Sequence, residues 1–142
     1  MNGLAHWPEG TVAVLSTIGE GPRAIPVSAA VRAGPSTVLL ALGHRRGSLA
    51  RLRDDPRVAL VLLAPGLAIT AHGQAAVAAD PLPGAEHAVA VALTVDEIQD
   101  HDRPAFSIED GVRWHWLDPE ARDADARVRV ALAELAKRRG GR

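Results

Sequence analysis

The chain has 142 residues, a formal net charge of -1 and no cysteine. This length suits one domain with its own hydrophobic core, and the lack of thiols excludes disulfide frameworks, zinc ribbons and cysteine nucleophiles. The near-neutral charge argues against a general nucleic-acid binder, because such proteins usually carry a net basic surface. No leader-like N-terminus and no apolar stretch of the ~18 residues that span a bilayer are found, so a cytoplasmic protein without a membrane segment is expected.

Three apolar, β-branched stretches come first in the chain and predict strands. Residues 11–18 form the first, and turn residues at 19–22 lead into the second at 24–32. A further turn at 33–36 precedes the third stretch at 37–43. This order predicts an antiparallel meander of three strands.

A short helix is predicted next, at residues 48–54. It must end near Asp55, because the residue before Pro56 is steered out of the helical region. Residues 58–63 and 67–78 are again apolar, and the Pro-Gly pair between them supplies turn chemistry. They predict a hairpin that follows the helix directly.

Later stretches are also predicted to be strands. Residues 87–99 carry valine or leucine at alternate positions, although their alanines leave a helical start open. Residues 106–108 and 112–116 flank an Asp-Gly pair, which is a strong signal for a two-residue hairpin. Trp114 and Trp116 are two positions apart in the last stretch, so both are expected on the same face of the sheet.

A long amphipathic helix is predicted at about 119–139. Pro119 suits its first turn and Glu120 its positive end, while basic residues in its last turn complement the negative end. Its apolar residues repeat at helical spacing, so one face must pack on another element. About seven or eight short strands with one inserted helix predict a mainly β, antiparallel barrel, and an α+β sandwich is the alternative that periodicity leaves open.

The segment between the third strand and the short helix is the strongest candidate for binding chemistry. It combines a helix N-terminus, whose amides and dipole favour anions, with the positive charges of Arg45 and Arg46. Arg51 lies one turn along and can return toward the same place. The alternative is an ordinary solvated basic face balanced by Asp54 and Asp55. The residues of this candidate phosphate site are Gly43, His44, Arg45, Arg46, Ser48, Leu49 and Arg51.

Pro26 marks a second candidate site. Proline cannot donate to a strand ladder, so inside a strand it indicates an edge or a bulge. An edge leaves neighbouring backbone groups free to bond a planar heterocycle with alternating donors and acceptors. The alternative is an ordinary edge that proline protects from aggregation.

Neither a metal site nor a hydrolase site is predicted. The six histidines lie at unrelated spacings, and no predicted helix presents two of them three or four residues apart. A haem or metal ligand among them is the less favoured alternative. No serine lies in a Gly-x-Ser-x-Gly context, which argues against a serine hydrolase.

Taken together, the segments resemble the pyridoxamine 5'-phosphate oxidase-like superfamily, the FMN-binding split barrels, over about residues 10–117. The most specific stretch is 49–58, a short helix closed by Asp-Pro-Arg-Val that feeds an apolar strand. The other matching stretches are 12–17 with its glycine-rich turn, Ile25-Pro26-Val27, 38–42, the arginine loop and His72-Gly73-Gln74-Ala75.

The resemblance implies one split-barrel domain over residues 1–142, working as a homodimer. A flavin phosphate is then expected at the arginine loop, with the second subunit completing the pocket. The flavin ring is expected along Pro26, Val27 and Ser28. Trp114 and Trp116 become candidates for the pocket or for the dimer interface.

The function that the resemblance implies is a flavin-dependent oxidoreductase. FMN or the deazaflavin coenzyme F420 would relay a hydride to a small organic substrate, since the coenzyme carries the reaction. Pro26 stands where pyridoxamine phosphate oxidases have an arginine, which argues against pyridoxamine phosphate as the substrate. The alternatives are a non-catalytic module that binds, stores or senses flavin or haem, and a structural dimer with a vestigial pocket.

Overall fold

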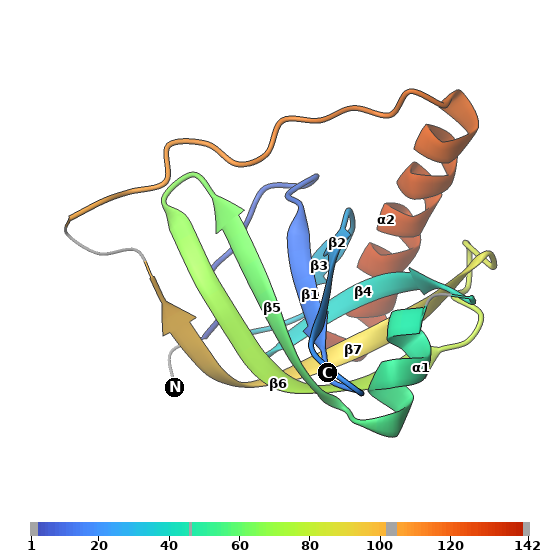
Figure 1. Cartoon of the computed structure of the whole chain (residues 1–142). Coiled ribbons are helices and arrows are strands. Elements are labelled where there is room, and N and C mark those ends of the chain that lie inside the picture. Colours follow the sequence, from blue (N-terminus) through green and yellow to red (C-terminus); the bar gives the residue numbers. More distant parts are fainter. Residues whose placement is uncertain (1–2, 46, 102–104, 141–142) are drawn as a thin grey trace.

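The computed structural model describes residues 3–45, 47–101 and 105–140, and these form seven strands and two helices (Figure 1). In chain order they are β1 (Ala13–Thr17), β2 (Arg23–Val27), β3 (Ala30–Arg32), β4 (Thr37–Gly43), α1 (Gly47–Asp54), β5 (Arg57–Ala64), β6 (Leu67–Ala79), β7 (Ala88–Asp100) and α2 (Pro119–Gly140). All strand pairs are antiparallel, in the order β2-β1-β5-β6-β7-β4-β3. The predicted mainly β split barrel with a short inserted helix and a C-terminal helix is confirmed.

The two edges of the sheet are consecutive in the chain. The single strand predicted at 24–32 is wrong: it is broken at Ser28 and Ala29 into β2, which pairs with β1, and β3, which pairs with β4. One straight strand cannot join both edges of an open sheet, so the chain bends between them. The sheet curls until these edges approach, as Figure 1 shows.

The longest pair, β6 with β7, carries the curvature of the sheet. Its register shifts between His72 and Gly73 and again between Val77 and Ala79. At the first shift the strands come so close that a Cβ on Gly73 would lie 1.9 Å from the backbone oxygen of Thr94. Only glycine fits there, and the irregular pairing lets both strands bend around the barrel.

The sheet has a core on each of its faces. In β4 the side chains alternate, so that Leu40 and Leu42 enter the barrel interior while Leu39 belongs to the cluster on the opposite face. This second cluster lies against α2, which contributes Val128 and Leu132 among others. The amphipathic helix predicted at about 119–139 therefore packs on the outer face of β3 and β4.

The hairpin predicted at 106–108 and 112–116 is wrong, because residues 105–117 contain no strand. They run in extended form across one end of the barrel, from the end of β7 toward the start of α2 (Figure 1). A chain that has to cover this distance cannot double back. Asp110 bonds instead to the next backbone amide at 2.9 Å, and the amide of Gly66 donates to the carbonyl of Ile108 at 2.8 Å.

Trp114 and Trp116 consequently do not share a strand face. Their rings pack edge to face, with centroids 5.2 Å apart and planes at 82°. Trp114 Nε1 donates to the carbonyl of Gly10 at 3.0 Å, which ties the extended segment to the N-terminal part of the chain. None of the described helices is long and apolar enough to span a membrane.

Candidate functional site

The loop between β4 and α1 has the form that the sequence predicted, a strand end that leads into a helix N-terminus. Gly43, His44 and Arg45 are exposed, and Arg46 lies outside the described residues. The first turn of α1 contains no acidic side chain that could compete for its amides. The backbone amides of this turn, the helix dipole and the charge of Arg45 together favour an anion at this point.

Helix α1 is anchored to the barrel by its buried side. Leu49 and Leu52 are buried in the interior cluster of the barrel, and Ser48 is buried beside them. The two leucines fix the direction of the helix axis and hence the position of its N-terminus. Leu49 therefore acts as an anchor below the loop, and Ser48 lies at the base of the loop.

Arg51 bonds to the turn between β1 and β2. Its Nε donates to Thr17 Oγ1 at 3.1 Å, and its Nη2 donates to the carbonyl of Gly21. A Cβ on Gly19 would lie 2.5 Å from the same guanidinium, so the turn fits closely around it. The described anion-favouring groups of the loop are thus Arg45 and the helix amides, while Arg51 connects α1 to the beginning of β2.

His44 links the loop to the connection between β6 and β7. Its Nε2 donates to the carbonyl of Glu86 at 3.1 Å, and its Nδ1 lies 3.6 Å from Asp80. Arg53 of α1 reaches the same carboxylate at 3.3 Å. These contacts hold the loop against a second segment, because three side chains from different parts of the chain meet there.

Strand β2 is an edge strand, as Pro26 predicted. It lies at one end of the sheet order, and Pro26 itself is exposed and pairs with Val14 of β1. Val27 is buried in the barrel interior. Ser28, at the bend into β3, donates its hydroxyl to Asp125 of α2 at 2.9 Å.

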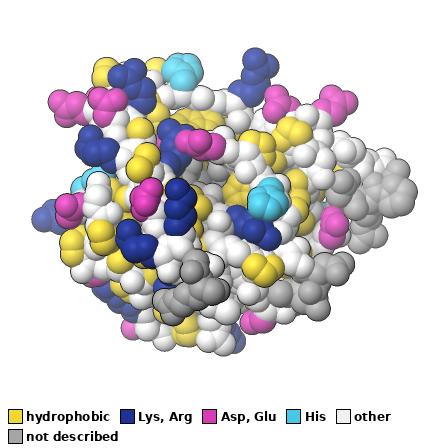
Figure 2. All heavy atoms as spheres, turned by 180° about the vertical axis from the view of Figure 1, so that it is seen from behind, with side chains coloured by type: hydrophobic (Ala, Val, Ile, Leu, Met, Phe, Trp, Pro, Cys, Tyr) yellow, Lys and Arg dark blue, Asp and Glu magenta, His cyan; other side chains and the backbone are white. Residues whose placement is uncertain are grey.

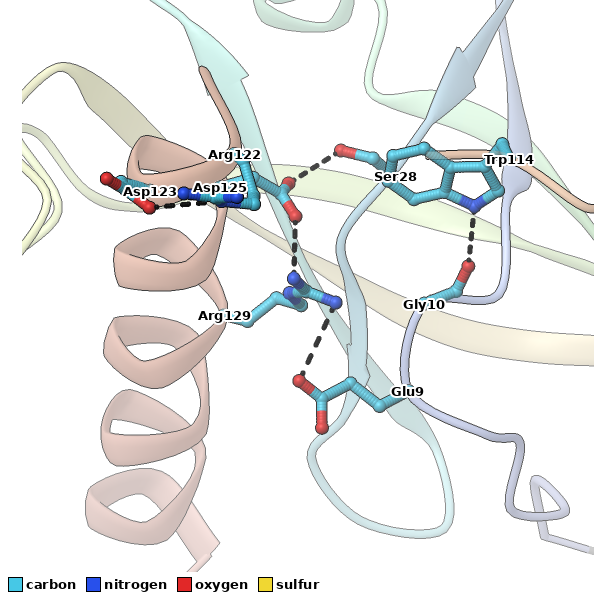
Figure 3. A network of polar contacts seen from close by, with 8 residues as sticks. All are labelled: Glu9, Gly10, Ser28, Trp114, Arg122, Asp123, Asp125 and Arg129. Atoms are coloured by element: carbon cyan, nitrogen blue, oxygen red, sulfur yellow. Dashed lines mark hydrogen bonds and ion pairs between the residues drawn. The ribbon is translucent and has the colours of Figure 1, made fainter. Parts of the chain in front are cut away.

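A pocket of about 330 Å³ lies at this bend, between the N-terminal segment, β3 and α2. Glu9, Ser28 and Arg129 of its lining belong to the polar contacts of Figure 3, in which Arg129 lies between two carboxylates. Arg129 Nη2 is 3.1 Å from Asp125, and Nη1 is 3.6 Å from Glu9. Figure 2, seen from behind, shows positive and negative side chains interspersed among apolar ones on the visible face of the molecule.

The sequence interpretation missed the pair of Asp125 and Arg129. A signal was present, because Asp125 lies three residues before Val128 and seven before Leu132, on the apolar face of the helix. A carboxylate at such a position needs a partner when it is buried. The partners of Asp125 are Ser28 and, in the same helix, Arg129. The linear sequence does not show that Ser28 lies close enough to bond it.

Among the described residues, no group of three or more histidine and acidic side chains is placed so that it could hold a metal ion. Of the two predicted tryptophans, Trp114 bonds to Gly10, which also lines the pocket beside α2, and Trp116 packs on Trp114. Trp116 Nε1 is buried without a hydrogen-bond partner in the described part of the chain. The structure thus brings the predicted residues to three places: the β4–α1 loop, the β2 edge and the segment next to Gly10.

The sequence matches no family model and no curated protein. The fold, in contrast, is similar to that of many solved structures. A candidate pyridoxamine 5'-phosphate oxidase from Listeria innocua is 16% identical, with a TM-score of 0.55 over 66% of this chain and 90% of that one. An F420 reductase is 11% identical, with a TM-score of 0.55 over 64% of this chain and 90% of that one.

A FAD-binding protein from Mesorhizobium loti is 11% identical, with a TM-score of 0.53 over 62% of this chain and 83% of that one. At such low sequence identities the similarity shows a shared fold and does not show a shared activity. These neighbours share the same curled antiparallel sheet, and their folds agree with the family that the sequence resembles. The chain therefore has the split-barrel fold of the pyridoxamine 5'-phosphate oxidase-like, FMN-binding proteins.

Proposed function

We propose that this protein binds a flavin-type coenzyme, FMN or F420, and uses it as an oxidoreductase on a small organic molecule. The observation that carries the proposal is the loop between β4 and α1. It offers an exposed arginine, Arg45, beside a helix N-terminus free of acidic side chains in its first turn. Solved proteins with the same fold include an F420 reductase and a FAD-binding protein, which supports a coenzyme of this type.

The phosphate and ring positions of such a coenzyme fit one corner of this chain. Arg51 connects α1 to the turn that begins β2, while β4 pairs through Val38–Leu40 with β3, which follows β2 in the chain. The loop and the β2 edge therefore flank the same region. A phosphate would bond Arg45 and the α1 amides, and a planar ring would lie along Pro26 to Ser28.

When bound, the coenzyme supplies the hydride chemistry. The residues of the chain would bind and orient it. The contacts of His44 to Asp80 and Glu86 would keep the loop in place during this binding.

We also propose that the protein is a homodimer that associates through the outer face of β1, β5 and β6. Val14 and Val61 are neighbours there and are only half-buried, and Leu63 is 42% exposed. A hollow of about 420 Å³ beside them is lined by Ile18 and His72 among others. Exposed aliphatic side chains in adjoining strands favour burial by a second copy.

Light scattering checks this association. The proposal expects a mass of about twice 14.9 kDa at micromolar concentration. A species of 14.9 kDa under these conditions would contradict it. The variant Leu63→Glu, which puts a charge on the proposed interface, should shift the equilibrium toward the single chain.

The coenzyme is tested by the absorbance of the purified protein and by titration with FMN and riboflavin. Each charge-assisted bond to phosphate contributes roughly 1.5–3 kcal/mol, so Arg45→Ala should weaken FMN binding by about one to two orders of magnitude. Arg45→Ala/Arg46→Ala should weaken it by about two to four orders. Riboflavin has the ring without the phosphate, so its affinity should change much less.

Arg122→Ala is the matched control, because Arg122 is an exposed arginine in the first turns of α2, outside the loop, and its side chain pairs with Asp123 in the described structure. It should leave both affinities unchanged. Equal weakening of FMN and riboflavin by Arg45→Ala, or no weakening of FMN, would remove the phosphate site from the loop. Absence of any bound coenzyme would favour a structural dimer.

A module that holds the coenzyme without turnover is the second candidate. It is favoured by the contacts of His44, the acid–base side chain in the described part of the loop, which is bonded to Glu86 and lies near Asp80. Such a module would retain its flavin, and added reductants and electron acceptors would not reduce and reoxidise that flavin in repeated turnovers. A Soret band in place of a flavin spectrum would indicate haem.

A further inference from the structure

The pocket next to α2 is separate from the arginine loop, since none of the residues 43–51 lines it. Its volume of about 330 Å³ lies at the lower end of the range typical for small-molecule sites, ~300–1,000 Å³. Most of its wall is apolar. The apolar wall consists of Trp7, Pro8, Ala29, Ala30, Val31, Val130 and Ala133.

The wall of the pocket is held in place by hydrogen bonds. Trp7 Nε1 donates to the carbonyl of Ala30 at 2.9 Å, so the indole is fixed against β3. Arg32 Nε donates to the carbonyl of Leu4 at 2.9 Å, which fixes the N-terminal segment beside it. A site whose walls are already ordered loses less conformational freedom when a ligand enters.

Two arginines line this pocket, Arg32 and Arg129, and Arg129 is the one held by a buried carboxylate. Arg129 is held through Nη2 by Asp125, whose side chain is only 7% exposed and also accepts the hydroxyl of Ser28. The Nε atom of Arg129 is buried and has no hydrogen-bond partner among the described residues. The second carboxylate, Glu9, is 78% exposed and lies 3.6 Å from Nη1, a loose surface contact.

We propose that this pocket binds a small carboxylic acid with an apolar, preferably aromatic, body. The carboxylate of the ligand takes the place of Glu9 on Arg129, because a guanidinium binds carboxylates with paired N–H donors. The body of the ligand packs on Trp7 and on the small side chains of β3 and α2. Asp125 stays bound to Arg129 and keeps the guanidinium in position.

The pocket adjoins the proposed coenzyme site through Ser28. This residue ends the stretch to which the flavin ring is assigned, and it also lines the pocket. This position would let the bound acid serve as the substrate of the coenzyme, and that role rests on the proposed function. Binding of the acid in the pocket does not depend on it. Direct binding is measured first for this reason.

The test is calorimetric titration of the full chain with 2-naphthoate and with the neutral 2-naphthamide. We expect 2-naphthoate to bind about tenfold or more tightly than the amide, as the loss of a charge-assisted bond predicts. Arg129→Gln should remove this preference. Equal affinity of the wild-type chain for the two compounds would overturn the proposal.

Two further variants leave the buried pair of Asp125 and Arg129 intact. Ala133→Trp fills the pocket and should weaken 2-naphthoate binding by about tenfold or more, since a filled pocket excludes the ring. Glu9→Gln removes the competing carboxylate and should tighten binding several-fold. Unchanged affinity in Ala133→Trp would place 2-naphthoate elsewhere and overturn the assignment.

A parallel titration with FMN separates this proposal from the proposed function. Binding of 2-naphthoate without binding of FMN would keep the acid site and contradict the coenzyme. Binding of FMN without binding of 2-naphthoate would do the reverse. Ala133→Trp should affect 2-naphthoate more than FMN, because Ala133 lines the pocket on α2 and lies away from the arginine loop in the chain.

Discussion

The two faces of the sheet are packed in different ways. The barrel interior is filled by large aliphatic side chains, with Leu15, Leu60 and Leu93 almost fully buried. The outer face below α2 is built largely of alanine, with Ala90 and Ala92 as examples. Small side chains let the helix approach closely but bury less apolar area per residue. The interior therefore provides most of the stability, and the α2 face has room for a pocket and a polar network.

The largest effect is expected where the interior depends on backbone contact. Gly73→Ala places a methyl group 1.9 Å from the carbonyl oxygen of Thr94, and a backbone atom can move only if β6 and β7 separate. We expect a loss of more than about 4 kcal/mol in the free energy of unfolding, or no folding at all. Gly21→Ala is the control, because a Cβ there meets nothing within 4 Å. Urea denaturation measures both, and similar midpoints would contradict the close approach at Gly73.

The same substitution made on each face tests the comparison directly. Leu60 in the barrel and Leu132 on α2 are both 0% exposed. Leucine to alanine in a core costs about 2–5 kcal/mol, more where the surroundings cannot close the cavity. The loss for Leu60→Ala should lie near the upper end of this range, because the strands are held in place by their hydrogen-bond ladders. The loss for Leu132→Ala should lie near the lower end, because the helix can shift to close the cavity. Equal losses in urea denaturation would mean that α2 is as rigid as the barrel.

A smaller effect is expected at the polar link between the two faces. Ser28→Ala removes the donor to Asp125 Oδ1 and leaves a buried carboxylate oxygen without this partner. The expected cost is about 1–3 kcal/mol. Ser107→Ala, at an exposed position of the extended segment, should change little. Thermal unfolding of the two variants compares them, and equal melting temperatures would show that the link does not hold α2.

The smallest effect concerns the end of α1 and disappears at low pH. Hydrogen bonds from the Arg57 side chain and backbone lower the pKa of Asp55 from 3.8 to about 2. A carboxyl whose pKa is lower in the folded chain than in the unfolded chain stabilises the fold at pH values above its unfolded pKa. The contribution of Asp55 is therefore present above pH 3.8 and is lost as the pH falls toward 2. Asp55→Asn should melt slightly below wild type at pH 5, and the difference should vanish near pH 2. A difference that does not depend on pH would exclude this carboxylate as its source.

Local signals predicted most of the barrel correctly. Two apolar stretches on either side of the Pro65-Gly66 turn predicted the hairpin of β5 and β6, and the Asp55-Pro56 pair marked the end of α1. The errors lie where long-range geometry overrides local preference. The bend at Ser28 follows from the need to join two sheet edges, and the Asp-Gly signal near residue 110 was overridden by the distance between β7 and α2.

The candidate site was predictable only in part, for a similar reason. The loop before α1 follows from neighbouring residues, so Arg45 and the helix N-terminus could be identified together. The partner of Arg51 could not, because Thr17 is 34 positions away. The network at Arg129 joins α2 with Glu9 and, through Asp125, with Ser28, so only the folded chain brings its members together.

The two-residue crossing between β2 and β3 couples barrel shape to helix position. The crossing bridges the seam of the split barrel, and its Ser28 hydroxyl is bonded to α2 across 97 positions of sequence. If the gap between β2 and β3 widens, the crossing is stretched, and the hydrogen bond from Ser28 passes the strain on to α2. The width of this gap and the position of α2 are therefore coupled, so that a molecule bound beside β2 would shift the helix on the outer face of the sheet.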